Sequence, residues 1–200
     1  MDGFEKRRND KKDSIMQAAM ELFIQYGFER VTVTEIAQKA RVSKVSIYNF
    51  FESKDNLRRI IVKGMMDSSL EKTTEIIASD AAFADKIKSY LACRTIYSDR
   101  RTYQFFFDAV GSDPVLRQSL EDFSATNKSL VLMLIKEGKK TGFIAPNVSN
   151  EALEIYIDIF QSYVLRLGNE AFNRFEVTPT LASEINQLFL DGLLRQEAGQ

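Results

Sequence analysis

Apolar residues recur at intervals of three and four along nearly the whole 200-residue chain. This spacing is the period of an amphipathic helix, whereas the period-two alternation of a half-buried strand is absent. In the first segment the apolar stripe consists of Ile15, Ala18, Ala19, Leu22, Phe23 and Tyr26. The pattern therefore predicts an all-α fold.

Punctuating residues divide this pattern into separate helices. Gly27 is expected to end the first helix, because glycine tolerates the left-handed conformation of a C′ position. Thr32 and Glu35 have the spacing of a capping box, which predicts the start of a second helix. Ser43 and Ser53 can cap a third and a fourth helix. The longer helices are expected over about 54–79, 82–98, 101–110, 114–141, 149–169 and 178–196.

Composition limits the chemistry that the chain can perform. It contains no histidine, which excludes Ser-His-Asp and Cys-His catalysis and most zinc sites. Cys93 is the only cysteine and cannot form an intrachain disulfide, as suits a reducing compartment. The sequence has neither a long apolar run nor an apolar leader. A cytoplasmic protein without membrane span, metal, cofactor or catalytic residues is expected.

Charge is unevenly distributed although the net charge is only −1. Residues 1–60 carry 12 Lys and Arg against 9 Asp and Glu, whereas residues 61–200 carry 15 against 19. The first segment is therefore net basic and the second net acidic. Such an asymmetry favours contact between the first 60 residues and a polyanion, although a solvated surface explains it as well.

Two short helices separated by a three-residue turn are typical of a helix-turn-helix unit, whose second helix enters the major groove of DNA. The second helix spans residues 44–50, and its apolar side, with Ile47, faces the preceding helix. Lys44 can donate to guanine, Asn49 can pair with adenine, and Val45 can contact a thymine methyl group. Ser46 and Tyr48 also face outward.

Residues 14–57 resemble the DNA-binding domain of the TetR family of bacterial repressors. The resemblance rests on Ala18, Leu22, Phe23, Gly27, Phe28, Thr32, Ile36, Ala37, Ala40, Val42, Ser43, Ile47, Tyr48, Phe51, Lys54 and Leu57. It implies that phosphates are bound by Thr32, Ser46, Tyr48 and Lys54, and that bases are approached by Lys44, Val45 and Asn49. Ser43, at the start of the same helix, completes the expected DNA-binding set.

The chain departs from the usual TetR pattern at three positions. Arg41 and Val45 stand where glycine is frequent, and Phe50 stands where His or Tyr is common. Arg41 must therefore accept the turn conformation, with φ > 0 if the turn requires it. Phe50 cannot donate a hydrogen bond to DNA. The basic N-terminal residues, Lys6, Arg7, Arg8, Lys11 and Lys12, fit either a solvated tail or an arm that follows the DNA.

Two domains are expected, a helix-turn-helix domain with a basic N-terminal arm over residues 1–58 and a larger helical ligand-binding and dimerisation domain over 59–200. Reading two half-sites of a palindromic operator requires a dimer. Broad apolar stripes within residues 149–196, together with the resemblance, favour a homodimer through the last two helices. Closure of the monomer core by these stripes is the alternative.

The middle of the chain is rich in aromatic residues that suit a mostly apolar pocket for a small-molecule effector. The candidate ligand-binding residues are Tyr90, Tyr103, Phe106, Phe107 and Met133. Core packing is the simpler role for such side chains. The favoured interpretation is a homodimeric repressor that an unknown, largely apolar ligand releases from double-stranded DNA. A regulator without such an effector, a carboxylate or Tyr-Lys enzyme and a protein-only interaction module are the alternatives.

Overall fold

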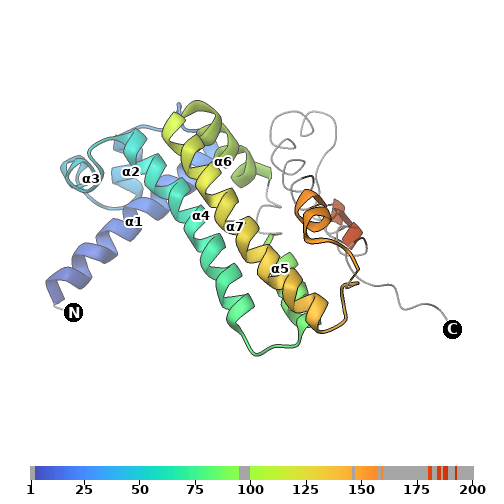
Figure 1. Ribbon diagram of the computed structural model, residues 1–200. Coiled ribbons are helices and arrows are strands. Elements are labelled where there is room, and N and C mark those ends of the chain that lie inside the picture. The colour runs from blue at the N-terminus through green and yellow to red at the C-terminus, as the bar shows by residue number, and fades with distance from the viewer. Residues whose placement is uncertain are drawn as a thin grey trace. The chain divides into compact units, whose positions relative to one another are not determined.

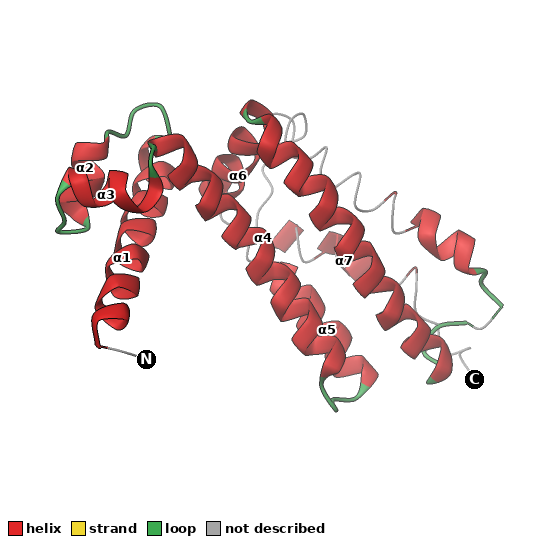
Figure 2. Ribbon diagram, turned by 60° about the vertical axis from the view of Figure 1, so that its left-hand side comes forward, coloured by secondary structure: helices red, strands yellow, loops and turns green. Residues whose placement is uncertain are grey.

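A computed structural model describes residues 3–94, 100–145 and 147–156, together with 159, 180, 181, 184, 185, 187, 188 and 192. Its named elements are all helices (Figures 1 and 2), which confirms the all-α prediction. They are α1 (Gly3–Tyr26), α2 (Val33–Lys39), α3 (Lys44–Phe51), α4 (Lys54–Ala78), α5 (Phe83–Arg94), α6 (Arg100–Ser112) and α7 (Pro114–Lys140). None of these described helices combines the length and apolarity that crossing a membrane requires.

Helix boundaries lie close to those that the capping residues indicate. Gly27 has φ of 82° and follows the last residue of α1, as expected for a C′ glycine. Thr32 and Glu35 form the full capping box at α2. The backbone N–H of Ser46 donates to the Ser43 hydroxyl at α3, and that of Asn56 donates to the Ser53 hydroxyl at α4.

The predicted helices after α7 are only partly described. Residues 150–156 and 159 are helical, as are 180, 181, 184, 185, 187, 188 and 192. The remainder of the stretches expected over 149–169 and 178–196, which includes Phe160, lies outside the described residues. The same holds for residues 95–99, at the end of the helix expected over 82–98.

The chain forms two compact units. Unit 1 consists of residues 1–66 and 104–119, and unit 2 consists of residues 67–103 and 120–200. Unit 1 is therefore discontinuous, since the second half of α6 and the start of α7 return to the helix-turn-helix segment. The functional boundary expected at residue 58 concerns where DNA and ligand are bound, and it stays a prediction.

The core of unit 1 is built on the predicted face of α1. Ile15 and Phe23 are buried together with Ile36 of α2 and Ile47 of α3. The Phe23 ring stacks on Phe105 of α6, with ring centroids 5.8 Å apart and an interplanar angle of 23°. An aromatic side chain of α6 is thus part of the core that positions the first three helices.

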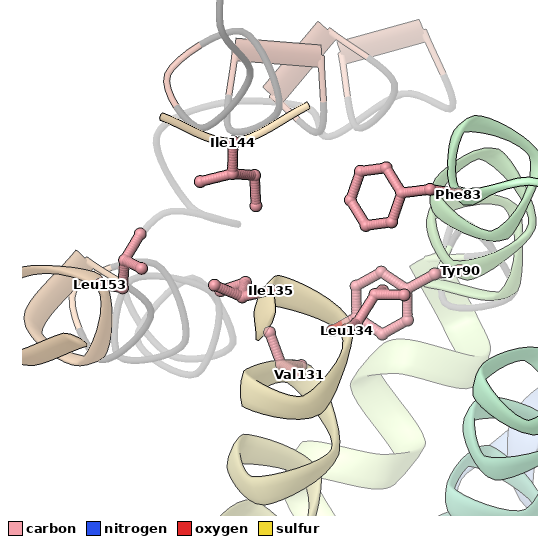
Figure 3. Close-up of a cluster of buried hydrophobic side chains, with 7 residues drawn as sticks. All are labelled: Phe83, Tyr90, Val131, Leu134, Ile135, Ile144 and Leu153. Atoms are coloured by element: carbon pink, nitrogen blue, oxygen red, sulfur yellow. The ribbon is translucent and has the colours of Figure 1, made fainter. Parts of the chain in front are cut away.

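Unit 2 has its own cluster of buried side chains (Figure 3), contributed by α5, α7 and the segment after α7. The cluster consists of Phe83, Tyr90, Val131, Leu134, Ile135, Ile144 and Leu153. Gly138 permits this packing, because a Cβ atom there would lie 2.5 Å from the Phe83 ring and 2.8 Å from the Ile144 side chain. Unit 2 therefore has a core of its own, distinct from that of unit 1.

Candidate nucleic-acid interface

The turn between α2 and α3 fixes the direction in which α3 leaves the core. The backbone N–H of Val42 donates to the Ala37 carbonyl over 2.9 Å, and that of Arg41 donates to the Gln38 carbonyl over 3.2 Å. Arg41 has φ of 54°, so the departure from glycine leaves a non-glycine residue in the left-handed region, as expected. The turn is formed despite the unfavourable residue type.

The outward face of α3 carries the side chains that were assigned to base contacts. Ile47 is buried, whereas Val45 is 65% exposed and Tyr48 is 50% exposed. Lys44 and Asn49 are exposed as well. The structure therefore brings these four candidates onto one accessible surface of a single short helix, where cationic, amide and apolar groups can meet base edges together.

The hydroxyl groups of the candidate set serve as helix caps. Ser43 Oγ and Ser46 Oγ lie 2.9 Å apart at the start of α3. Both donors of Thr32 are already engaged, since its N–H and its hydroxyl each donate to Glu35 Oε2 over 2.7 Å. These bonds hold the pKa of Glu35 below its usual value, with the backbone bond as the first cause. Thr32 would have to exchange a partner to donate to a phosphate.

Lys54 packs against the loop between α1 and α2. Its ammonium donates to the carbonyls of Phe28 and Val31, each over 3.0 Å, and lies 4.2 Å from the centroid of the Phe28 ring. The Arg58 guanidinium lies 3.9 Å from the same centroid. Because an ammonium has three donors, Lys54 keeps one for a phosphate while it fastens this loop.

An ion cluster within unit 1 was not anticipated from the sequence. Asp113 is buried and accepts from Arg59 Nε over 2.6 Å, while Arg58 lies 3.8 Å from the same carboxylate oxygen. The Arg59 bond holds the pKa of Asp113 below its usual value. Asp113 also accepts from the Val115 N–H at the start of α7. The residues concerned, Ser112, Asp113 and Pro114, lie where the helix expected over 101–110 gives way to the one expected over 114–141.

The basic N-terminal residues belong to α1, which begins at Gly3. The segment from Lys6 to Lys12 is therefore helical and not an extended tail. The Arg8 guanidinium lies 5.7 Å from the centroid of the Phe50 ring on α3. This contact brings the N-terminal part of α1 beside α3.

The candidate ligand-binding residues occupy different environments. Tyr90, Tyr103 and Phe106 are buried, Phe107 is half-buried and Met133 is exposed. Burial raises the pKa of the Tyr103 hydroxyl. Phe106 and Phe107 contact each other edge to face, with centroids 5.2 Å apart. Among the described residues, no group of three or more Cys, Asp and Glu side chains is placed to hold a metal ion.

Residues 15–59, which include α2 and α3 with their caps, match the family described as bacterial regulatory proteins, tetR family. This match places residues 15–59 in the tetR family. Over 142 residues it is 26% identical to the HTH-type transcriptional regulator YhgD of Bacillus subtilis (strain 168), covering 68% of this chain and 73% of YhgD. It is 28% identical to RutR of Escherichia coli (strain K12), covering 68% of this chain and 65% of RutR.

Solved structures share the fold of this chain. The transcriptional regulator FadR of Bacillus subtilis, crystallised with stearoyl-CoA, aligns with a TM-score of 0.65 at 18% identity. The alignment covers 90% of this chain and 98% of FadR. YhgD and RutR are also named as transcriptional regulators, and together with the family match they identify the chain as a helix-turn-helix transcriptional regulator.

Proposed function

We propose that this regulator is a homodimeric repressor, that α3 reads a palindromic operator, and that a small, largely apolar ligand releases it. The observation that carries the proposal is the accessible face of α3. Lys44, Val45, Tyr48 and Asn49 are exposed there, while Ile47 and Phe51 are buried and anchor the helix. A rigid helix with this division can present a fixed set of groups to the major groove.

Each residue of this surface has a distinct role in the proposal. Lys44 and Asn49 supply donors and an acceptor for base edges, and Val45 contacts a thymine methyl group. Tyr48 and the free donor of Lys54 bind phosphates, which set the position of α3 without reading sequence. Ser43 and Ser46 act through the cap that holds the first turn of α3.

The homodimer is supported by apolar side chains that the single chain leaves in solvent. Ile155, Ile159 and Leu188 are 60%, 64% and 69% exposed. Ile155 and Ile159 are four residues apart and so share one helix face. All three belong to the segment 149–196 that was expected to dimerise, and a second copy of the chain would cover them. Two recognition helices then meet successive major grooves, about 34–36 Å apart.

The proposed effector binds among aromatic side chains of α6. Three of the candidate ligand-binding residues lie on α6, namely Tyr103, Phe106 and Phe107. Their aromatic side chains favour an apolar ligand. The FadR structure contains stearoyl-CoA, whose acyl chain is an apolar group of the kind proposed here, although its coenzyme A part is polar. A ligand releases DNA when it binds better to a conformation in which the two recognition helices no longer match the operator.

The direct test is selection of bound duplexes from a random pool by the full-length protein. We expect enrichment of a palindrome whose half-sites lie one helical turn apart, about 10 to 10.5 base pairs. Asn49→Ala should relax the preference at one base pair in each half-site, at a cost of about 1–3 kcal/mol per site. Gln38→Ala, at an exposed position of α2, is the control and should leave base preference unchanged. A pool that stays random after selection contradicts DNA recognition by α3.

A further inference from the structure

The N-terminal turns of α1 carry basic side chains on the same face that is buried further along the helix. Ile15 is fully buried, and Arg8, Lys11 and Lys12 precede it by seven, four and three residues. Residues at these spacings lie on one side of a helix. The face that packs into unit 1 thus continues toward the N-terminus as a basic strip of Arg8, Lys11 and Lys12.

Two contacts fix where this basic strip lies. The Ser14 hydroxyl donates to the Ala40 carbonyl, directly before the turn that leads to α3, over 3.4 Å. One helical turn and a half further out, the Arg8 guanidinium lies over the Phe50 ring, 5.7 Å from its centroid. Phe50 is adjacent in sequence to Asn49, on the exposed face of α3. The strip is therefore continuous with the surface that reads DNA.

The acidic residues of this segment do not neutralise the basic strip. Asp10 and Asp13 project from the opposite side of α1, which follows from their positions in the helical period. Glu5, three residues before Arg8, is the acidic residue of this segment that shares the side of the helix on which the strip lies. All of these residues are exposed except Lys12, which is half-buried. The strip presents net positive charge beside α3.

We infer that Arg8, with Lys11 and Lys12, binds backbone phosphates of the DNA that α3 enters, and that the Phe50 ring positions the Arg8 guanidinium for this contact. The inference rests on the proposed DNA binding and extends it to a part of α1 outside residues 15–59. It also assigns a role to Phe50, a side chain that cannot donate a hydrogen bond itself.

The chemistry of the Arg8–Phe50 pair suits this role. A guanidinium over an aromatic ring is held through its face, so the N–H groups at its edges stay available for a planar phosphate contact. The ring also limits the rotamers of a long side chain, which reduces the entropy lost on binding. Such a contact strengthens binding to any sequence, because phosphates carry no base information.

The test compares Arg8→Gln with Lys6→Gln, which removes a charge from the opposite side of the same helical segment. Binding of full-length protein to a random-sequence 30-base-pair duplex is measured from 50 to 200 mM salt. Losing one phosphate contact should make the salt slope shallower by about 0.9. From 50 to 200 mM salt, the factor by which affinity falls should therefore be roughly 3- to 4-fold smaller for Arg8→Gln than for the wild type. Lys6→Gln should keep the wild-type slope.

Positioning by Phe50 is tested with Phe50→Leu, alone and combined with Arg8→Gln. If the ring orients Arg8, Phe50→Leu lowers duplex affinity, and the double variant is no weaker than the stronger single defect. Strictly additive losses overturn the role of Phe50. If the wild type binds the duplex and Arg8→Gln has the same salt slope as the wild type, the phosphate contact by Arg8 is wrong. The proposed DNA binding itself is then unaffected. Failure of the wild type to bind any duplex overturns the proposed function instead.

Discussion

Two residues with unfavourable backbone conformations flank the two ends of α3. Arg41 has φ of 54° in the turn before it, and Glu52 has φ of 65° directly after Phe51. In this region an L side chain other than glycine costs roughly 1–2 kcal/mol. The burial of Ile47 and Phe51 between them holds α3 at this length. The helix that reads DNA is thus kept short at a measurable cost to stability.

Arg41→Gly should raise the free energy of unfolding by about 1 kcal/mol, because glycine adopts this φ without strain. Arg41→Ala removes the same charge but keeps the Cβ atom, so it should give little or no stabilisation. Chemical denaturation of both variants at neutral pH separates strain from charge. Equal stabilisation by the two substitutions would assign the effect to the charge of Arg41.

Asp113→Asn should destabilise the protein by about 2–3 kcal/mol at pH 7, since it removes the buried carboxylate that Arg59 Nε binds over 2.6 Å and leaves the buried Arg58 guanidinium with the exposed Asp55 as its partner charge. The folded-state pKa of Asp113 lies below the ordinary 3.8. Its contribution is therefore complete above that value and is lost as pH falls through the folded pKa. The difference in the free energy of unfolding between the variant and the wild type should become smaller below about pH 4. Urea unfolding at pH 7 and pH 3 measures it.

Asp108→Asn on the same helix is the control for this titration. Asp108 is exposed and accepts from the Gln104 side chain over 2.7 Å. Its replacement should change stability little at either pH, since exposed polar contacts contribute little. A pH-independent loss in Asp113→Asn would contradict an ionic role for Asp113.

At the level of elements, the sequence predicts what local chemistry determines. The capping box at Thr32, the caps at Ser43 and Ser53 and the glycine at 27 each act within four residues, so their signals are readable. The first turns of α1 lack an apolar stripe, which hid their helicity. Stacking of Phe105 on Phe23 joins residues 82 apart in the chain, and no periodicity reports such a contact.

The helices that have residues in both units could not be identified from local sequence signals. In the structure α4, α6 and α7 each have residues in both units. The surface of α3, by contrast, was predicted correctly, because which side of a short helix is buried depends on its own apolar spacing.

Ser43→Ala should lower the free energy of unfolding by about 1 kcal/mol, because it removes the acceptor that caps the first turn of α3. Ser46→Ala is the matched control. The Ser46 hydroxyl contacts the Ser43 hydroxyl, but it caps no backbone donor among the bonds of this turn. Ser46→Ala should therefore lower the free energy of unfolding by less than half as much as Ser43→Ala. Thermal unfolding of both variants decides whether the Ser43 cap supports α3.

For the whole molecule, Leu188→Asp should shift the protein from dimer to monomer. Leu188 is largely exposed in the single chain, so the monomer should still fold, whereas a dimer would have to bury the new charge. Sedimentation at several concentrations measures the change. Val115→Asp, also at an exposed apolar residue but in unit 1, should remain dimeric. A fully dimeric Leu188→Asp would exclude Leu188 from the interface.

Coupling between effector and operator should be reciprocal. An effector identified by thermal-shift screening should weaken operator binding by roughly 5- to 150-fold, and the operator should weaken effector binding by the same factor. Phe107→Leu keeps an apolar, half-buried side chain and should change effector affinity while ligand-free operator affinity stays near wild type. Titrations of each ligand with and without the other test both. Tight effector binding without any loss of operator affinity would indicate a regulator that this effector does not switch.

The discontinuity of unit 1 has a consequence for synthesis on the ribosome. The Phe105 ring and the Asp113 carboxylate that complete this unit lie in residues 104–119, whereas its main part ends at residue 66. At about 5–20 residues per second, the 53 residues from 66 to 119 take roughly 3 to 11 s to emerge. During that interval the nascent helix-turn-helix segment has an unfinished core, and closing it requires a long loop to form. A chain of this design gains its DNA-binding surface only after more than half of it has been translated.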